Sequence, residues 1–327
     1  MRWLRLAATL STLLALGCAG SAASREASLA RWQRVCAQFG SAAAAPAAPA
    51  SSASGPTAAS AQPTQSPTAH DMRALRTSAS RATPALVHIR TVVRPPQTAG
   101  ADADTSRAAA RGSGGTGVII DAEGLILTNA HVVRDATEIR VVCADGGLAR
   151  VLAVASDPVQ DLALLRVELA TDTAGPEPET GAAVRLPRAL PPNAAAVCAG
   201  QPVVSLGVLD GSEPPQQRVG VVLDDSASLQ ARLDPSGARD YSRLIESSAP
   251  IEPGFSGGPL LDRDGRFVGL NVAVRTRPDG TRLGYALRFG EPQQAAIARL
   301  RAEVARGQAL SGSATAPASA AASARGG

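Results

Sequence analysis

The chain has 327 residues, enough for one large or two modest domains, and 45% of them are hydrophobic. All 32 basic residues are Arg, and the formal net charge of +4 lies entirely within residues 1–39, so the remaining body is neutral. A neutral body argues against nucleic acid as the main partner.

The N-terminus has the features of an export signal. Met1–Leu16 combines two Arg with a short apolar run, and residues 1–23 are therefore predicted to be a secretory signal peptide rather than a membrane span. Ala15-Leu16-Gly17-Cys18 resembles a bacterial lipobox, which implies lipidation and membrane anchoring at Cys18. Ordinary cleavage near Ala19–Ala23 is the alternative. Either reading predicts a protein of the periplasm or cell envelope.

Residues 24–71 are predicted to connect this signal to a folded domain. Ser24–Phe39 has apolar side chains at helical spacing, which favours either a docking helix or a partly ordered N-terminus. Gly40–Thr68 is almost entirely Ala, Pro, Ser, Thr, Gly and Gln, a composition that cannot bury a core. We therefore expect a disordered tether there.

Residues 72–306 read as a succession of short strands. Pro84–Val93 is the first, and Gly, Asp and Pro turns separate many of the others. This spacing predicts an all-β fold of antiparallel sheets or barrels. Helical periodicity returns only at Gln293–Arg306, which we expect to pack on the preceding barrel, before a low-complexity tail at 307–327. The further strands are predicted at Glu138–Cys143, Arg150–Ala155, Leu162–Val167, Val203–Leu206, Val219–Val222, Leu244–Glu246, Pro259–Leu261 and Phe267–Val274.

Two motifs suggest ligands and are set aside. Gly112–Gly117 satisfies G-x-G-x-x-G, but a strand follows it where a dinucleotide fold needs a helix. The four cysteines contain no CxxC pair, so no metal site and no cofactor is predicted. In an exported protein Cys143 and Cys198 are candidates for a disulfide, with two buried thiols as the alternative.

The candidate chemistry lies in three separated segments. Ser256 stands in the glycine-rich turn Ile251–Pro259, where a side chain can point out and react. His131 begins a segment just beyond a predicted strand end. Asp161 leads into an apolar strand, so its carboxylate should be partly buried and should need a donor such as an imidazole N–H.

These segments, TNAHVV, DPVQDLALLRV and SSAPIEPGFSGGPLLDRDGRFVGLNVAV, resemble in order the three catalytic segments of the HtrA/Deg branch of trypsin-fold endopeptidases. The resemblance covers roughly Ala85 to Arg306. It implies two six-stranded antiparallel barrels, the active site in the cleft between them, and polypeptide substrates. The implied fold class is thus an all-β, trypsin-like double barrel with a C-terminal helix.

The resemblance also implies residue roles. His131 would be the general base, Asp161 its orienter and Ser256 the nucleophile. The oxyanion hole would be formed by the loop Gly254–Phe255–Ser256, through the N–H groups of its first and last residues. Substrate would contact Ile251 and pair with the strand Leu270–Asn271–Val272.

Two departures from the family pattern bear on function. The family usually has Asn where this chain has Phe255, and a bulky apolar group there is expected to reshape the oxyanion loop. We also expect no PDZ domain after the protease domain. The predicted function is a serine endopeptidase that acts on unfolded or damaged envelope proteins, with a homo-oligomer left open. The alternatives are a catalytically silent binding module, with Phe255 holding the loop collapsed, and an envelope-anchored scaffold.

Overall fold

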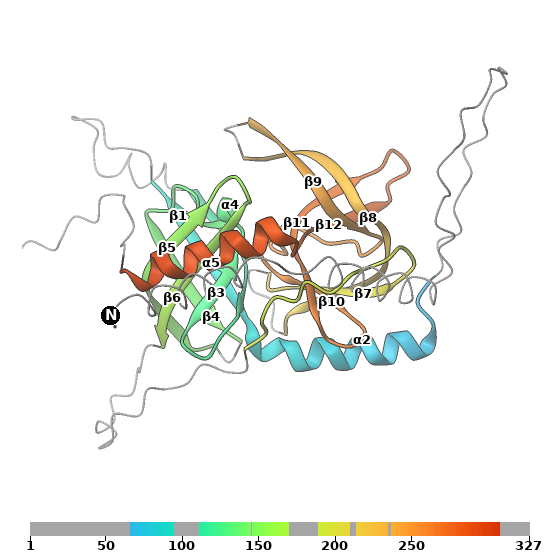
Figure 1. Ribbon diagram of the computed structural model, residues 1–327, viewed down its shortest axis with the longest axis horizontal. Helices are drawn as coiled ribbons and strands as arrows, with labels where there is room; N and C mark the ends of the chain where they lie inside the picture. Colours follow the sequence, from blue (N-terminus) through green and yellow to red (C-terminus); the bar gives the residue numbers. More distant parts are fainter. Residues whose placement is uncertain are drawn as a thin grey trace, which may run out of the picture.

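Two six-stranded antiparallel barrels lie side by side in the computed structural model (Figure 1). The structure describes residues 66–94, 111–144, 146–169, 189–209, 214–234 and 237–307. The predicted fold class, an all-β double barrel with a C-terminal helix, is confirmed. The predictions for the signal peptide, Cys18, the N-terminal helix and the C-terminal tail fall on residues outside these ranges, as does nearly all of the tether.

The first barrel closes in the order β1-β2-β3-β6-β5-β4. The glycine run that was predicted to precede a strand lies inside β2 instead, where it pairs with β1. A Cβ at Gly117 would come within 2.9 Å of Val87, Ile89 and Ile126, so only glycine fits against this packed interior. The strands are β1 Leu86–Val93, β2 Arg111–Ile119, β3 Leu125–Thr128, β4 Glu138–Cys143, β5 Leu148–Asp157 and β6 Leu162–Leu169.

The second barrel closes in the order β10-β11-β12-β9-β8-β7. Its longest feature is the hairpin of β8 and β9, of which the predicted strands Val219–Val222 and Leu244–Glu246 are only the base. Several register shifts interrupt the pairing of this hairpin, and they explain why strict alternation is not visible in the sequence. The strands are β7 Pro202–Gly207, β8 Gln216–Asp234, β9 Gly237–Ser247, β10 Pro259–Asp262, β11 Phe267–Thr276 and β12 Arg282–Arg288.

A helix that the sequence analysis did not anticipate precedes the first strand. This helix, α2 (Ala69–Ala82), packs on the second barrel and leads through the short 3-10 turn Thr83–Ala85 into β1 of the first barrel (Figure 1). Thr68 and Asp71 form a reciprocal capping box that satisfies two backbone donors at its start. The helix therefore joins both barrels.

The C-terminal helix α5 (Glu291–Ala305) forms where it was predicted but packs elsewhere. Its buried face of Ala296, Ile297, Leu300 and Val304 lies against β5 and β6 of the first barrel, not against the second barrel that precedes it (Figure 1). Arg301 pairs with Asp121 at 2.9 Å, and Arg299 pairs with Asp157. The expectation of packing on the preceding barrel is therefore wrong, because both these charged partners and the apolar surface belong to the first barrel.

The proposed Cys143–Cys198 disulfide is also wrong. Cys143 is a buried, reduced thiol at the end of β4 in the first barrel. Cys198 is buried and disulfide-bonded, so its bond is to a cysteine other than Cys143. The alternative of two thiols fails for Cys198 as well.

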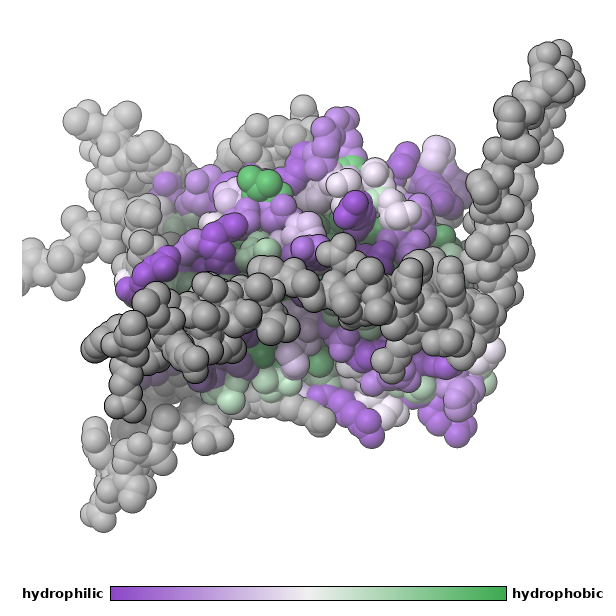
Figure 2. Space-filling model, viewed as in Figure 1, coloured by the Kyte–Doolittle hydropathy of each residue, from purple (hydrophilic) through white to green (hydrophobic). Residues whose placement is uncertain are grey.

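The described surface seen in Figure 2 is mostly hydrophilic, with small scattered apolar patches. Among the described residues, no helix has the length and apolar character needed to cross a membrane. No group of three or more His, Cys, Asp or Glu is placed to hold a metal ion within the same ranges.

Candidate active site

The structure brings His131 and Asp161 together inside the first barrel. His131 lies in the single-turn helix α4 (Ala130–Val133) after β3, and Asp161 stands just before β6, the strand that pairs with β3. The Oδ2 atom of Asp161 is 2.8 Å from Nδ1 of His131, and its Oδ1 atom accepts the backbone N–H of His131 at 3.0 Å. This leaves the Nε2 edge of the imidazole for a second partner.

Local backbone geometry holds the acid in this position. Asp161 has a left-handed φ of 54°, an uncommon conformation for a residue with a side chain. The buried amide of Asn129 donates to the Asp161 carbonyl oxygen at 3.1 Å and ties the two loops together. The Asp161 side chain is 0% exposed, so its charge depends on these donors for compensation.

Two further side chains reach Asp161 from the second barrel, and the sequence analysis missed both. The hydroxyl of Tyr241, on β9, donates to Oδ2 at 2.9 Å. Arg239, two residues earlier, places Nη1 3.9 Å from Oδ1 and also donates to the Pro158 carbonyl. Burial, followed by the nearby charge of Asp161, raises the pKa of Tyr241, so the phenol keeps the proton that it donates.

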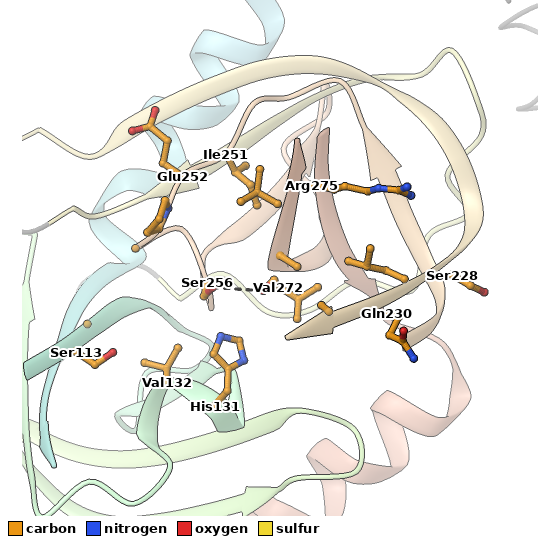
Figure 3. Close-up of a pocket in the computed structure, with 17 residues that line it drawn as sticks. Ser113, His131, Val132, Ser228, Gln230, Ile251, Glu252, Ser256, Val272 and Arg275 are labelled. Atoms are coloured by element: carbon orange, nitrogen blue, oxygen red, sulfur yellow. Dashed lines mark hydrogen bonds between the residues drawn. The ribbon is translucent and has the colours of Figure 1, made fainter. Parts of the chain in front are cut away.

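Ser256 lies in a loop that the first barrel fastens in place. The backbone N–H of Thr116 in β2 donates to the Ser256 carbonyl at 2.8 Å. The side-chain hydroxyl of Thr116 donates to the Gly254 carbonyl at 2.7 Å. Gly254 and Gly257 have φ of 99° and 82°, which only glycine adopts without strain. The Ser256 hydroxyl donates to the Val272 carbonyl at 3.4 Å, and Figure 3 shows the His131 ring lying next to it.

Two backbone N–H groups of this loop point to an oxyanion site. Gly254 and Ser256 both line the cleft, and neither N–H has an acceptor within the described residues. The N–H of Phe255 donates to the Glu252 carbonyl at 3.0 Å, so Phe255 contributes no free donor and does not belong to the predicted oxyanion set.

The side chain of Phe255 points away from the cleft. It is 0% exposed, and its ring lies where a Cβ on Gly207 would come within 2.8 Å. The Arg218 guanidinium stands over the ring, 5.6 Å from its centroid. Phe255 thus anchors the loop against β7 instead of filling the oxyanion site.

A cleft of about 700 Å³ opens between the barrels in front of Ser256 (Figure 3). Ile251, Val272 and Ala273 give it apolar walls, and Ser228–Ala231 of β8 form its far side. The carboxylate of Glu252 is paired with Arg218, and this hydrogen bond lowers the pKa of Glu252. No unpaired carboxylate lines the cleft within the described residues.

The predicted substrate strand is only partly placed for that role. Leu270 lies in the core, and the buried Asn271 amide bonds Ser205 and Leu206, so neither side chain reaches the cleft. Val272 sits at a register shift between β11 and β12. Asn271 still exchanges backbone hydrogen bonds with Gly257 and Gly258 on the β10 side, and beyond it β11 has no strand partner on that side among the described residues. Val272–Thr276 therefore presents an open strand edge that begins beside Ser256.

Comparisons with known proteins agree with this geometry. A model of the trypsin-like peptidase domain matches residues 115–270. The periplasmic serine endoprotease DegP of Escherichia coli K12 is 31% identical over 173 residues, which cover 52% of this chain and 32% of DegP. Protease Do-like 1, chloroplastic, of Arabidopsis thaliana is 31% identical over 171 residues, covering 52% of this chain and 35% of that protein.

A solved structure of the HtrA-type protease AlgW with a tripeptide superposes with a TM-score of 0.50 and 26% identity, covering 72% of this chain and 64% of that one. The chain spans about a third of the length of the two curated relatives. The fold and the match over residues 115–270 define a trypsin-like peptidase domain. Within that class, the proteins that this chain resembles include HtrA/Deg-type serine proteases.

Proposed function

We propose that this protein is a serine endopeptidase that cleaves unfolded or damaged polypeptides through an acyl-enzyme. One observation carries the proposal: His131 is held by Asp161 at 2.8 Å beside Ser256, in a cleft also lined by Gly254, and the N–H groups of Gly254 and Ser256 have no acceptor among the described residues. Nucleophile, base, orienting acid and oxyanion donors are the parts that acyl transfer needs.

The residues would act in a fixed order. Ser256 Oγ attacks the scissile carbonyl carbon while Nε2 of His131 takes its proton. The N–H groups of Gly254 and Ser256 stabilise the oxyanion that forms, and the carboxylate of Asp161 stabilises the protonated imidazole. His131 then gives the proton to the leaving amine, and water cleaves the acyl-enzyme by the same steps. In the structure the Ser256 hydroxyl donates to Val272, so rotation about its Cα–Cβ bond precedes attack.

The open edge of β11 supports a preference for unfolded substrates. A peptide can add to Val272–Thr276 as a further antiparallel strand only if it is extended along several residues. Folded proteins seldom offer such a segment, because their backbone groups are already paired.

The decisive experiment compares the wild type with Ser256→Ala on reduced, unfolded casein. We expect the variant to fold and to lose about 10³-fold or more of kcat. Labelling by a fluorophosphonate is the second measurement, because only a serine activated by its histidine reacts rapidly. A wild type that neither cleaves casein nor takes up the label would instead support the silent binding module.

Export and anchoring are further parts of the proposal. Three observations support export: the apolar N-terminal segment with Cys18, the periplasmic designation of DegP, and the disulfide at Cys198. Disulfides are typical of oxidising compartments. Metabolic labelling with a radioactive fatty acid tests lipidation. We expect the label to disappear in Cys18→Ala, and an unlabelled wild type would favour ordinary cleavage. Sedimentation of the purified protein tests for a homo-oligomer.

A further inference from the structure

The carboxylate of Asp161 takes hydrogen bonds from both barrels. His131 supplies two of them, from its ring and its backbone N–H, and Tyr241 supplies the third at 2.9 Å. The Tyr241 side chain belongs to β9, a strand of the other barrel that lies 80 residues further along the chain. The acid therefore depends on the docking of the β8–β9 hairpin.

Arg239 reinforces this contact from the same strand. Its guanidinium carbon lies 5.7 Å from the centroid of the Tyr241 ring, and its Nη1 is 3.9 Å from Oδ1 of Asp161. The two carboxylate oxygens thus face different partners from the hairpin: Oδ2 faces the phenol of Tyr241, and Oδ1 faces the guanidinium of Arg239. This arrangement fixes the rotation of the carboxylate group about its terminal bond.

The same hairpin forms the far wall of the substrate cleft. Leu229 pairs with Tyr241, and Ala231 pairs with Arg239, across β8 and β9. Both β8 residues line the cleft. The strand that would touch substrate, β8, is therefore hydrogen-bonded directly to β9, the strand whose Tyr241 bonds Asp161.

We propose that Tyr241 is a positioning residue for the Asp161–His131 pair, and that Tyr241 and Arg239 together set the orientation of the Asp161 carboxylate and the share of its charge that reaches His131. The proposal deepens the proposed function and rests on it. Tyr241 touches no reacting atom; it acts only through Asp161.

Electrostatics gives the sign of the effect. Donors to a carboxylate draw on its negative charge, so their loss leaves more charge to stabilise a protonated His131. The groups facing Asp161 are His131, Tyr241 and Arg239, and Arg134 lies near enough to act on Tyr241. Loss of the phenol or of the guanidinium should therefore move the acid limb of the kcat/KM profile to higher pH.

Tyr285 offers a matched control for Tyr241. It is the other of the two tyrosines in the chain, it is buried in the same barrel, and its hydroxyl donates to a carboxylate, that of Glu246, at 2.8 Å. Tyr241→Phe should lower kcat/KM about 10-fold to 100-fold with little change in KM, the loss expected for a hydrogen bond to a charged group. Tyr285→Phe should leave the rate and its pH profile unchanged.

The pH profile separates positioning from general loosening. Tyr241→Phe should move the acid limb upward, whereas a merely structural role would give the behaviour of Tyr285→Phe and overturn the proposal. If Tyr241→Phe does not fold, Arg239→Gln is the second variant, because its side chain is partly exposed. Its acid limb must also move to higher pH, and an unchanged limb would overturn the proposal.

A measurement without turnover keeps this proposal distinct from the proposed function. The proton on Nδ1 of His131 gives a nuclear magnetic resonance signal that responds to its bond with Asp161. We expect this signal to shift in Tyr241→Phe and not in Tyr285→Phe, even in a protein that cleaves nothing. An unshifted signal in Tyr241→Phe, in a protein that does cleave casein, would refute the positioning role and leave the endopeptidase assignment standing.

Discussion

The hydroxyl of Thr116 donates to the carbonyl oxygen of Gly254 at 2.7 Å, and this bond ties the first barrel to the loop that carries Ser256. The same hydroxyl accepts the N–H of Val208 at 2.8 Å, and the Thr116 side chain is fully buried. One hydroxyl thus satisfies a backbone acceptor and a backbone donor of the second barrel. The orientation of the Gly254 peptide, and with it the oxyanion site, depends on the contact between the barrels.

Thr116→Val tests this dependence at nearly constant volume. It leaves the partly buried Gly254 carbonyl and Val208 N–H without their hydroxyl partner, so unfolding free energy should fall by about 1–3 kcal/mol. We also expect kcat to fall more than KM rises, because the oxyanion donor moves. Urea unfolding and casein kinetics check both. Thr137→Val is the control, since its hydroxyl also bonds a backbone carbonyl, that of Val92, but on the surface. Equal losses in the two variants would contradict the special role of Thr116.

The packing of Phe255 on Gly207 gives a second prediction. A Cβ at position 207 would come within 2.8 Å of the ring, and the ring would have to move together with the Ser256 loop. Gly207→Ala should therefore cost about 1–3 kcal/mol of stability, as overpacking does, and should lower activity. Adding Phe255→Leu, which replaces the ring with a smaller side chain, should restore part of the lost stability and part of the lost activity.

The control for this prediction is Gly112→Ala, where the nearest atom to a new Cβ is 4.0 Å away. It should change stability and activity little. A Gly207→Ala protein that keeps wild-type unfolding and turnover would show that the loop tolerates the shift.

The walls of the cleft predict specificity. Ile251 and Val272 are apolar, and the carboxylate of Glu252 is engaged by Arg218, so no described residue of the cleft compensates the desolvation of a basic side chain. Cleavage should follow small aliphatic residues such as Val or Ala and avoid Arg. Mass-spectrometric mapping of cuts in an unfolded protein decides this, and a dominance of Arg and Lys at the cleaved positions would refute it. Arg218→Met, which releases Glu252, should increase cuts after basic residues.

The sequence indicated the three residues of the proposed catalytic site but not the side chains around them. His131, Asp161 and Ser256 stand in motifs beside strand ends, and the resemblance of these motifs to the HtrA/Deg segments indicated them. Tyr241 was missed because it lies in a polar hairpin whose register shifts hide the period of two. The partner surface of α5 could not be read from its apolar face, since both barrels offer apolar sheets. The cysteine pairing depended on tertiary distances that spacing does not encode.

The sequence contains no Lys, the residue whose ordinary pKa lies close to that of Tyr, so titration near pH 10 reports on the tyrosines. This gives a last prediction that is independent of catalysis. The chain has two tyrosines, and the pKa of each is raised. In Tyr241 the cause is burial, followed by the charge of Asp161. In Tyr285 burial, followed by the hydrogen bond to Glu246, raises the pKa to about 12. A raised folded-state pKa means that the folded protein holds protons that the unfolded chain releases. The stability they contribute is complete below about pH 10, the ordinary tyrosine value, and is lost as pH rises above it through the folded values. The ultraviolet absorbance of tyrosinate should therefore appear at higher pH in the native protein than in urea, and unfolding free energy should fall over that window. Tyr241→Phe should make the fall shallower and halve the absorbance change in urea. Native and urea titrations that coincide would show that both phenols are open to solvent.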